Sequence, residues 1–297
     1  MEILVLKRGS EIFIIKLEIM EQSKFEQIVE EQLKLGRPKI AFGIKESNSV
    51  IEESLRRGEK YADLVLVSKQ EIPGFKTVVS ENPEYKIIDM LLDGEVDGIV
   101  RGTIDDFGAF YHYCKKTGFI KNKVINPGLM ETPEVDTPSG KKKYQFFISP
   151  GSNPEGWEVE EKIYLTEGIA EFMRTLGWEP KIGFFTSVRP GSIGKNPKMD
   201  QTWHDAEKCV QYFKEKGYNA INYNIESNTA IEDGANLIVP ANGMIGNQMF
   251  RMVLVSGGKC IICPRINLPH IYEDTSRTEK DFEWHIKYAA AWANSKK

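Results

Sequence analysis

The sequence predicts an α/β protein made of two α/β halves, in which helices pack on mainly parallel sheets. From residue 38 onward, short β-rich runs alternate with amphipathic stretches, which is typical of parallel strands joined by crossover helices. Most of the strand-like runs are apolar throughout, as expected for sheets covered on both faces. A stretch rich in Pro, Gly and charged residues, 126–143, separates two halves of similar size.

The individual elements follow from residue type and period. Runs of β-branched and aromatic residues between turn signals predict strands at residues 39–44, 63–67, 98–101, 144–148, 181–186, 220–224, 237–239 and 259–263. Stretches with one apolar stripe predict helices at residues 49–57, 85–92, 161–176, 202–216, 246–255 and 281–294. Two apolar runs interrupted by charges within residues 1–20 predict two short strands rather than a signal peptide.

The chain is expected to divide near residue 150. The first domain comprises residues 1–149 together with 264–297, because the irregular stretch 264–274 allows the last helix to return to the first half. The second domain comprises residues 150–263.

Composition excludes several functional classes. The 39 Lys and Arg residues against 43 Asp and Glu residues give a net charge of -4, which is too even to predict a nucleic-acid partner. The longest apolar runs are far shorter than the roughly 20 residues that cross a bilayer, so no membrane partner is expected. Four cysteines in 297 residues are too few for a disulfide scaffold, which favours a cytoplasmic location.

Cys260 and Cys263 form a CxxC motif. Residues three apart in a strand point to opposite faces, so the two sulfurs are expected to diverge rather than share a metal ion. The chain has neither a second CxxC nor an HExxH motif, and we therefore expect no metal site.

The first candidate binding loop follows the strand at 181–186 and carries Arg189, Gly191, Ser192 and Gly194. Ligands bind at strand ends of α/β sheets. Backbone amides of such a loop can converge on an anion, and Arg189 can add bidentate hydrogen bonds to phosphate or carboxylate. A glycine-rich surface turn explains the same residues equally simply.

The second candidate lies where the strand at 237–239 meets a helix and comprises Asn242, Gly246 and Asn247. Unpaired amides and the positive end of the dipole favour an anion at a helix entrance. Asn247 as an ordinary N-cap would explain the same residues without a ligand.

The third candidate precedes the last helix. Ser276 and Glu279 have the spacing of a capping box, which gives the serine a structural explanation. Capping does not explain Arg277. Its neighbour four residues on is Asp281, a spacing that suits either an ion pair or a paired acid/base and anion-binding role.

Taken together, these motifs resemble the phosphate acetyltransferase and butyryltransferase superfamily. The resemblance rests on the segments 97–103, 191–192, 246–251 and 274–277, and it covers the chain from about residue 38 to its end. Within the superfamily the sequence most resembles methanogenesis marker protein 4, a family also labelled methyltransferase subunit X. The resemblance implies two α/β domains with an interdomain cleft, and a homodimer formed through the second domain.

The resemblance also implies catalytic roles. In the acyltransferases a carboxylate near a Ser-Arg pair takes the proton from the thiol of coenzyme A, and the thiolate attacks the acyl phosphate carbonyl. Ser276 and Arg277 match the pair directly. The carboxylate remains open between Asp281 and Glu283.

The sequence departs from the acyltransferases after the first motif, because the segment 107–113 lacks the further arginine that they carry there. Arg101 is the candidate to supply that charge, and Gly102 and Thr103 beside it complete the predicted phosphate-binding set.

We therefore expect a phosphate acyltransferase-like protein of methanogenic metabolism that transfers an acyl or one-carbon group between phosphate and a thiol. Coenzyme A or another thiol would be the co-substrate, with no permanently bound cofactor. The alternative is a non-catalytic binding or regulatory protein, or a methyltransferase-associated subunit, that keeps the anion cleft. The sequence has neither a glycine-rich adenosylmethionine loop after its first strand nor a DxHxxG corrinoid motif.

Overall fold

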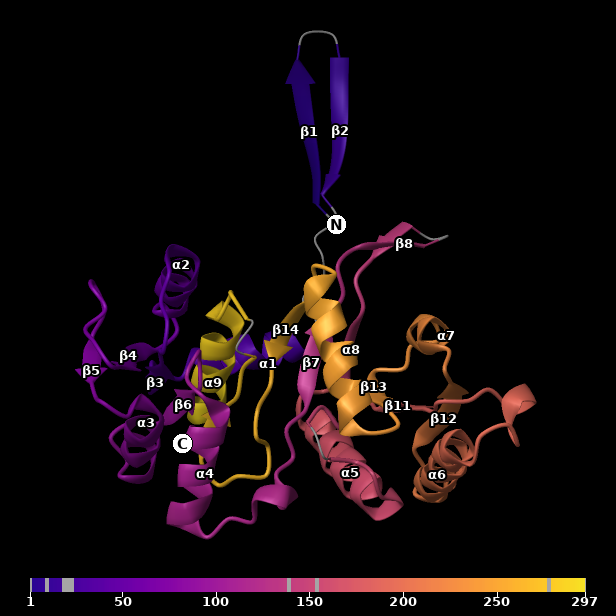
Figure 1. The fold of residues 1–297 in the computed structure, drawn as a ribbon. Helices are drawn as coiled ribbons and strands as arrows, with labels where there is room; N and C mark the ends of the chain where they lie inside the picture. Colours follow the sequence, from indigo (N-terminus) through magenta and orange to yellow (C-terminus); the bar gives the residue numbers. More distant parts are fainter. Residues whose placement is uncertain are drawn as a thin grey trace.

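The computed structural model describes residues 2–8, 11–17, 24–137, 140–152, 155–276 and 279–296. Within them the chain forms two mainly parallel sheets flanked by helices, which confirms the predicted α/β class (Figure 1). Two N-terminal strands, β1 (Glu2–Arg8) and β2 (Glu11–Leu17), pair antiparallel with each other, as the charged apolar runs predicted. None of the helices in the described ranges is long and apolar enough to cross a membrane.

The first sheet has five parallel strands in the order β15-β6-β3-β4-β5. Their bounds are β3 (Lys39–Gly43), β4 (Asp63–Ser68), β5 (Thr77–Val79), β6 (Gly98–Val100) and β15 (Ile271–Glu273). Because side chains alternate along a strand, Ile40 and Phe42 of β3 face one helical layer while Ala41 faces the other. The layers are α2 (Ser49–Gly58) with α9 (Glu283–Ser295), and α3 (Pro83–Leu92) with α4 (Asp106–Thr117).

The second sheet has six strands in the order β12-β11-β13-β10-β7-β14. Their bounds are β7 (Gly128–Glu131), β10 (Gln145–Ile148), β11 (Lys181–Phe185), β12 (Asn219–Asn224), β13 (Leu237–Val239) and β14 (Lys259–Ile262). One face is covered by α1 (Lys24–Leu33), α5 (Val159–Thr175) and α6 (Pro197–Glu215), and the other by α7 (Ser227–Glu232) and α8 (Gly243–Val255). Both halves are thus three-layered.

The two sheets part earlier in the chain than the boundary expected near residue 150. β10 pairs in parallel with β13, and β7 pairs antiparallel with β10, so residues 128–148 contribute to the second sheet. The stretch rich in Pro and Gly is therefore not a linker. It contains β7 and a small antiparallel hairpin, β8 (Val135–Thr137) with β9 (Gly140–Lys142).

The last helix joins the two halves. On α9, Ile286 and Ala289 belong to the apolar core of the first sheet, whereas Tyr288 and Ala291 belong to the core that covers the second. α9 begins at Glu283 rather than at residue 281, and Phe282 is its N-cap residue. The predicted capping box between Ser276 and Glu279 is therefore not the start of this helix.

Candidate functional site

A pocket of about 210 Å³ lies between the two sheets. It forms where the carboxyl ends of β6, β15, β10 and β14 meet, since the residues that follow each of these strands reach it. Its lining residues are Arg101, Asp106, Asn126, Gly128, Ile148, Gly151, Ser152, Asn247, Phe250, Arg251, Cys263, Asp274, Thr275 and Ser276. The structure thus brings together three residues from separate predicted motifs, namely Arg101, Asn247 and Ser276.

Four charged side chains form a network at the floor of the pocket. The guanidinium of Arg101 donates to Asp274 and, through Nη1, to the carbonyl oxygen of Ile104 at 2.8 Å. The guanidinium of Arg265 donates to Asp106 and, at 3.2 Å, to Oδ2 of Asp274. Both arginines are almost fully buried, so their charges are satisfied by carboxylates rather than by water.

The two carboxylates of the network differ in how readily they take up a proton. Burial raises the pKa of Asp274, but the Arg101 and Arg265 guanidiniums outweigh it and lower that pKa to about 2. The surrounding protein removes part of the hydration of Asp106, which raises its pKa; Arg265 only partly offsets this, and the pKa stays above its ordinary value. Asp106 is therefore the carboxylate of this network that takes up a proton more easily.

Sequence reasoning missed Arg265, which follows β14. Its guanidinium lies 3.7 Å from the ring centroid of Phe110 and 4.4 Å from that of Tyr272. This stacking explains how the buried charge is tolerated beyond its two ion pairs. Asp106 was also missed. The signal that would have found both is topological, since each residue follows a buried strand whose end reaches the pocket.

Gly102 and Thr103 were predicted to bind phosphate, but the structure gives both a packing role. Gly102 has φ +64°, and a Cβ there would lie 2.2 Å from the carbonyl oxygen of Gly43, so only glycine fits. The Thr103 hydroxyl accepts a hydrogen bond from the Lys45 amide at 2.9 Å. Neither residue lines the pocket.

The start of α8 packs closely against the loop that follows β10. A Cβ on Gly246 would lie 1.9 Å from the carbonyl oxygen of Pro150, so this glycine allows close packing of the helix on the loop after β10. Asn242 is the N-cap residue, and its Oδ1 accepts from the Ile245 amide at 3.1 Å. The alternative that Asn247 caps the helix is wrong.

The side chain of Asn247 instead forms hydrogen bonds with Gly151 and Arg251. Its Nδ2 donates to the carbonyl oxygen of Gly151 at 3.0 Å, and its Oδ1 accepts from Nε of Arg251 at 2.9 Å. Asn247 therefore connects the loop after β10 to Arg251, which lies one helical turn further along α8. Arg251 was absent from the predicted site.

The glycine and serine loop does not reach the pocket. Arg189 forms an ion pair with Glu226 at 2.6 Å, and the Gly194 amide donates to Asp200 at 3.0 Å. Gly191 and Ser192 lie in the 3-10 turn Pro190–Ser192 on the surface of the second half. The structure therefore favours the alternative interpretation of this loop, a surface turn.

The two carboxylates considered as catalytic base also lie elsewhere. Arg57 on α2 binds Asp281 at 2.8 Å and Glu283 at 2.8 Å, and Lys60 binds Glu283 at 2.9 Å. These ion pairs fasten the start of α9 to α2, and neither carboxylate lines the pocket. Arg277 lies outside the described residues, whereas Ser276 beside it lines the pocket.

The expectation that Cys260 and Cys263 diverge is wrong. The register of β14 against β7 shifts between Cys260 and Ile262, and this bulge interrupts the regular alternation of side chains. Cys263 consequently packs against the same apolar cluster that contains Cys260. Cys263 also lines the pocket, where Nδ2 of Asn126 donates to its carbonyl oxygen at 2.8 Å.

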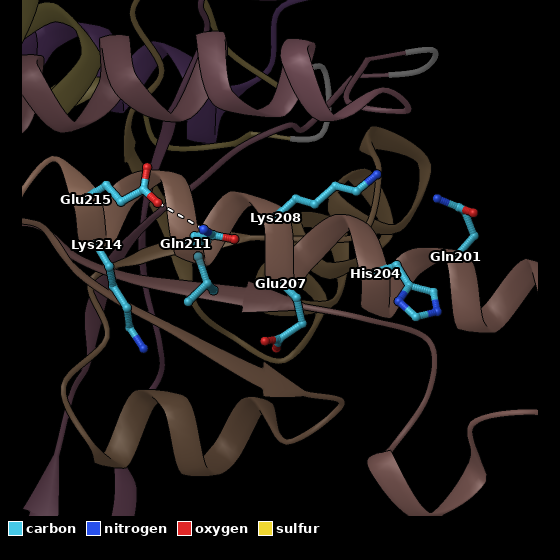
Figure 2. Close-up of a pocket in the computed structure, with 8 residues that line it drawn as sticks. Gln201, His204, Glu207, Lys208, Gln211, Lys214 and Glu215 are labelled. Carbon is cyan, nitrogen blue, oxygen red and sulfur yellow. Dashed lines mark hydrogen bonds between the residues drawn. The ribbon is translucent and has the colours of Figure 1, made fainter.

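A second hollow, of about 620 Å³, lies along the exposed side of α6 (Figure 2). It is lined by Gln201, His204, Glu207, Lys208, Val210, Gln211, Lys214 and Glu215. Their side chains come from one helix and spread in different directions, with a single hydrogen bond drawn, between Gln211 and Glu215 (Figure 2). This surface lacks the convergent polar groups that mark a binding site.

The chain matches no model of a protein family. It is 30% identical over 279 residues to a proposed methyltransferase mtx subunit X from Methanosarcina mazei, covering 91% of this chain and 96% of that protein. It is likewise 30% identical over 270 residues to the protein of the same name from Methanosarcina barkeri, covering 88% and 96%.

Solved structures show a related fold. A branched-chain phosphotransacylase from Enterococcus faecalis has a TM-score of 0.63 at 16% identity, covering 86% of this chain and 98% of that one. A phosphotransacetylase from Streptococcus pyogenes has a TM-score of 0.61 at 14% identity, covering 93% and 99%. The fold is phosphotransacetylase-like.

Proposed function

The chain belongs to the mtx subunit X family, and from that premise and its pocket we propose that it transfers an acyl or one-carbon group between phosphate and a thiol cofactor. The observation that carries this proposal is the pocket between the sheets. It combines an arginine of α8, the hydroxyl-bearing Ser276 and a carboxylate with a raised pKa. A phosphoryl anion, a thiol and a proton acceptor can meet in such a site.

We assign the proton acceptor to Asp106. Asp274 uses both carboxylate oxygens, Oδ1 for Arg101 and the Thr275 amide and Oδ2 for Arg265. Asp106 binds Arg265 through Oδ1 alone, and within the described part of the chain no hydrogen bond engages its Oδ2. That oxygen, in a side chain that is 44% exposed, is available to a thiol in the pocket.

The proposed reaction has one transfer step. Asp106 takes the proton of the thiol, the sulfur attacks the carbonyl carbon of the acyl phosphate, and the new C–S bond forms. The bond between the carbonyl carbon and the oxygen that links it to phosphorus breaks, and phosphate leaves with that oxygen and the electron pair. Ser276, and Arg277 next to it in sequence, would steady the phosphate and the developing charge.

The test is thioester formation from coenzyme A and a panel of acyl phosphates. We expect turnover by the wild type, and a decrease of about 100-fold or more in kcat for Asp106→Asn with a small change in KM, since a general base contributes roughly 10²–10⁴-fold. Asp281→Asn should retain the activity. Loss of activity in Asp281→Asn alone would return the base to Asp281, one of the two carboxylates that the family resemblance left open. A wild type inactive with every acyl phosphate would refute the transfer.

One observation favours a second candidate, a non-catalytic binding or regulatory protein that keeps the anion pocket. Arg101 and Arg265 are both engaged by carboxylates, so neither brings an unpaired charge to a transition state. Such a protein would bind coenzyme A or phosphate without turnover and would co-purify in stoichiometric amount with an enzyme of methanogenic metabolism.

A further inference from the structure

Among the described residues two arginines line the pocket, and their charges are compensated differently. Arg101 is 4% exposed and forms an ion pair with Asp274. Arg251 is exposed, and the described part of the chain places no carboxylate within ion-pair distance of it. Arg101 and Arg265 are each paired with an aspartate. Among the described residues, Arg251 is the pocket arginine without a carboxylate partner.

The orientation of Arg251 is fixed through its Nε. This atom donates to Oδ1 of Asn247 at 2.9 Å, and Nδ2 of the same asparagine donates to the carbonyl oxygen of Gly151 at 3.0 Å. The amide of Asn247 is thus held at both ends, one on the loop and one on the guanidinium. With Nε occupied, the two terminal nitrogens of Arg251 are left to hold an oxyanion as a fork.

We propose that Arg251 binds the phosphate group of the acyl phosphate in this pocket, and that Asn247 is the residue that positions it. The inference rests on the proposed function for the identity of the substrate, but the phosphate site itself does not require turnover. A planar guanidinium whose Nε is already anchored suits a tetrahedral phosphoryl group with several equivalent oxygens. The hydroxyl-bearing Ser152 and Ser276 line the same space and can donate to the remaining oxygens.

The test is calorimetric titration of the full chain with inorganic phosphate. We expect Arg251→Ala to weaken phosphate binding about 10- to 100-fold, as for loss of hydrogen bonds to a charged group. Arg251→Lys, which keeps the charge but not the fork, should fall between the wild type and Arg251→Ala. Arg174→Ala is the matched control. Arg174 is an exposed arginine on α5 that forms an ion pair with Glu179, and it lies outside the pocket.

Two further measurements separate this inference from the proposed reaction. Asn247→Ala leaves the guanidinium in place, so it should weaken phosphate binding less than Arg251→Ala. In the thioester assay, Arg251→Ala should raise KM for the acyl phosphate, while KM for coenzyme A should stay within about twofold of the wild-type value.

Phosphate affinity unchanged in Arg251→Ala, or no phosphate binding by the wild type, would overturn the inference. So would a loss of affinity confined to coenzyme A, which would assign Arg251 to a phosphate of the thiol cofactor. Phosphate binding through Arg251 without any acyl transfer would instead refute the proposed function and leave the inference intact.

Discussion

Glu273 and His285 form a buried titrating pair directly behind the pocket. Both side chains are 0% exposed, and Nδ1 of His285 lies 2.7 Å from Oε1 of Glu273, which also accepts from the Cys263 amide. Burial raises the pKa of Glu273 to about 7. Burial lowers the pKa of His285, but the hydrogen bond and charge of Glu273 outweigh it, so this pKa is raised above its ordinary value.

This pair predicts that the protein loses stability as the pH rises. A group whose pKa is raised on folding contributes stability that is complete below its unfolded pKa and is lost through its folded pKa. For Glu273 that window runs from its ordinary value of 4.5 to about 7, and His285 acts in the same direction above 6.5. Glu273→Gln removes the titrating carboxylate. Denaturant unfolding should therefore show a smaller decrease in the free energy of unfolding from pH 5 to pH 8 in the variant than in the wild type.

We expect Glu273 to account for a loss of unfolding free energy on the order of 2–3 kcal/mol across this range, from roughly 1.4 kcal/mol for each unit of pKa shift, and this share should be missing in Glu273→Gln. The same pH dependence in wild type and Glu273→Gln would show that other groups dominate the linkage.

For individual residues, the sequence identified some members of the site and not others. Arg101, Asn247 and Ser276 were found because each stands in a local motif at a strand end or helix start. Arg251, Asp106 and Arg265 were missed because no local spacing shows that residues 101–106 and 247–276 converge on one pocket. Asp281 and Glu283 were chosen by their distance in sequence from Arg277, but their partners are on α2, and only the tertiary fold supplies those.

Among the elements, the strands were the most predictable. β3, β4, β11 and β13 lie within one residue of their expected bounds, because helices cover both sheet faces and the centre of each strand is apolar. α4 was missed because its sequence, DFGAFYHYCKKT, contains a glycine and four aromatic residues that weaken the apolar period. β7 was missed because it is a four-residue strand inside a stretch rich in Pro and Gly.

The helix α8 leads to a prediction about assembly. Met244, Met252 and Val255 recur on one face of the helix and are 45%, 59% and 80% exposed. The family resemblance implied a homodimer through the second half, and we propose that this face of α8 is its contact. Burying such apolar side chains against a second copy is favourable, at about 25 cal/mol per Å² of apolar surface.

The molar mass of the purified protein, measured by light scattering, tests this contact. The wild type should have the mass of two chains, and Met252→Asp should have the mass of one at the same concentration with unchanged circular dichroism. Leu35→Asp is the control, because Leu35 is 69% exposed and follows α1. A monomeric wild type, or a Met252→Asp variant that stays dimeric, would rule out this interface.

On the scale of the whole molecule, the two sheets are joined by α9 and share the pocket between them. Residues after β6 and β15 approach it from one half, and residues after β10 and along α8 approach it from the other. Asp106, Ser276 and Arg251, the described residues of the proposed chemistry, all line it. We therefore expect the ligand to bind in this pocket and not at the glycine and serine loop that follows β11.

Matched substitutions at two glycines can show whether the ligand binds in the pocket or at the loop after β11. A Cβ on Gly151, in the pocket lining, would meet no heavy atom within 4 Å, and the same holds for Gly191 in the loop. Neither glycine has a positive φ that only glycine tolerates, so tryptophan can be introduced at either position without backbone strain. Gly151→Trp fills space in the pocket, and Gly191→Trp adds the same ring on the surface.

The most direct measurement is calorimetric titration of wild type, Gly151→Trp and Gly191→Trp with coenzyme A, with and without inorganic phosphate. Our account predicts that the wild type and Gly191→Trp bind with similar affinity, while Gly151→Trp keeps its melting temperature and loses at least tenfold in affinity. Full binding by Gly151→Trp together with loss of binding by Gly191→Trp would contradict it and place the ligand at the loop.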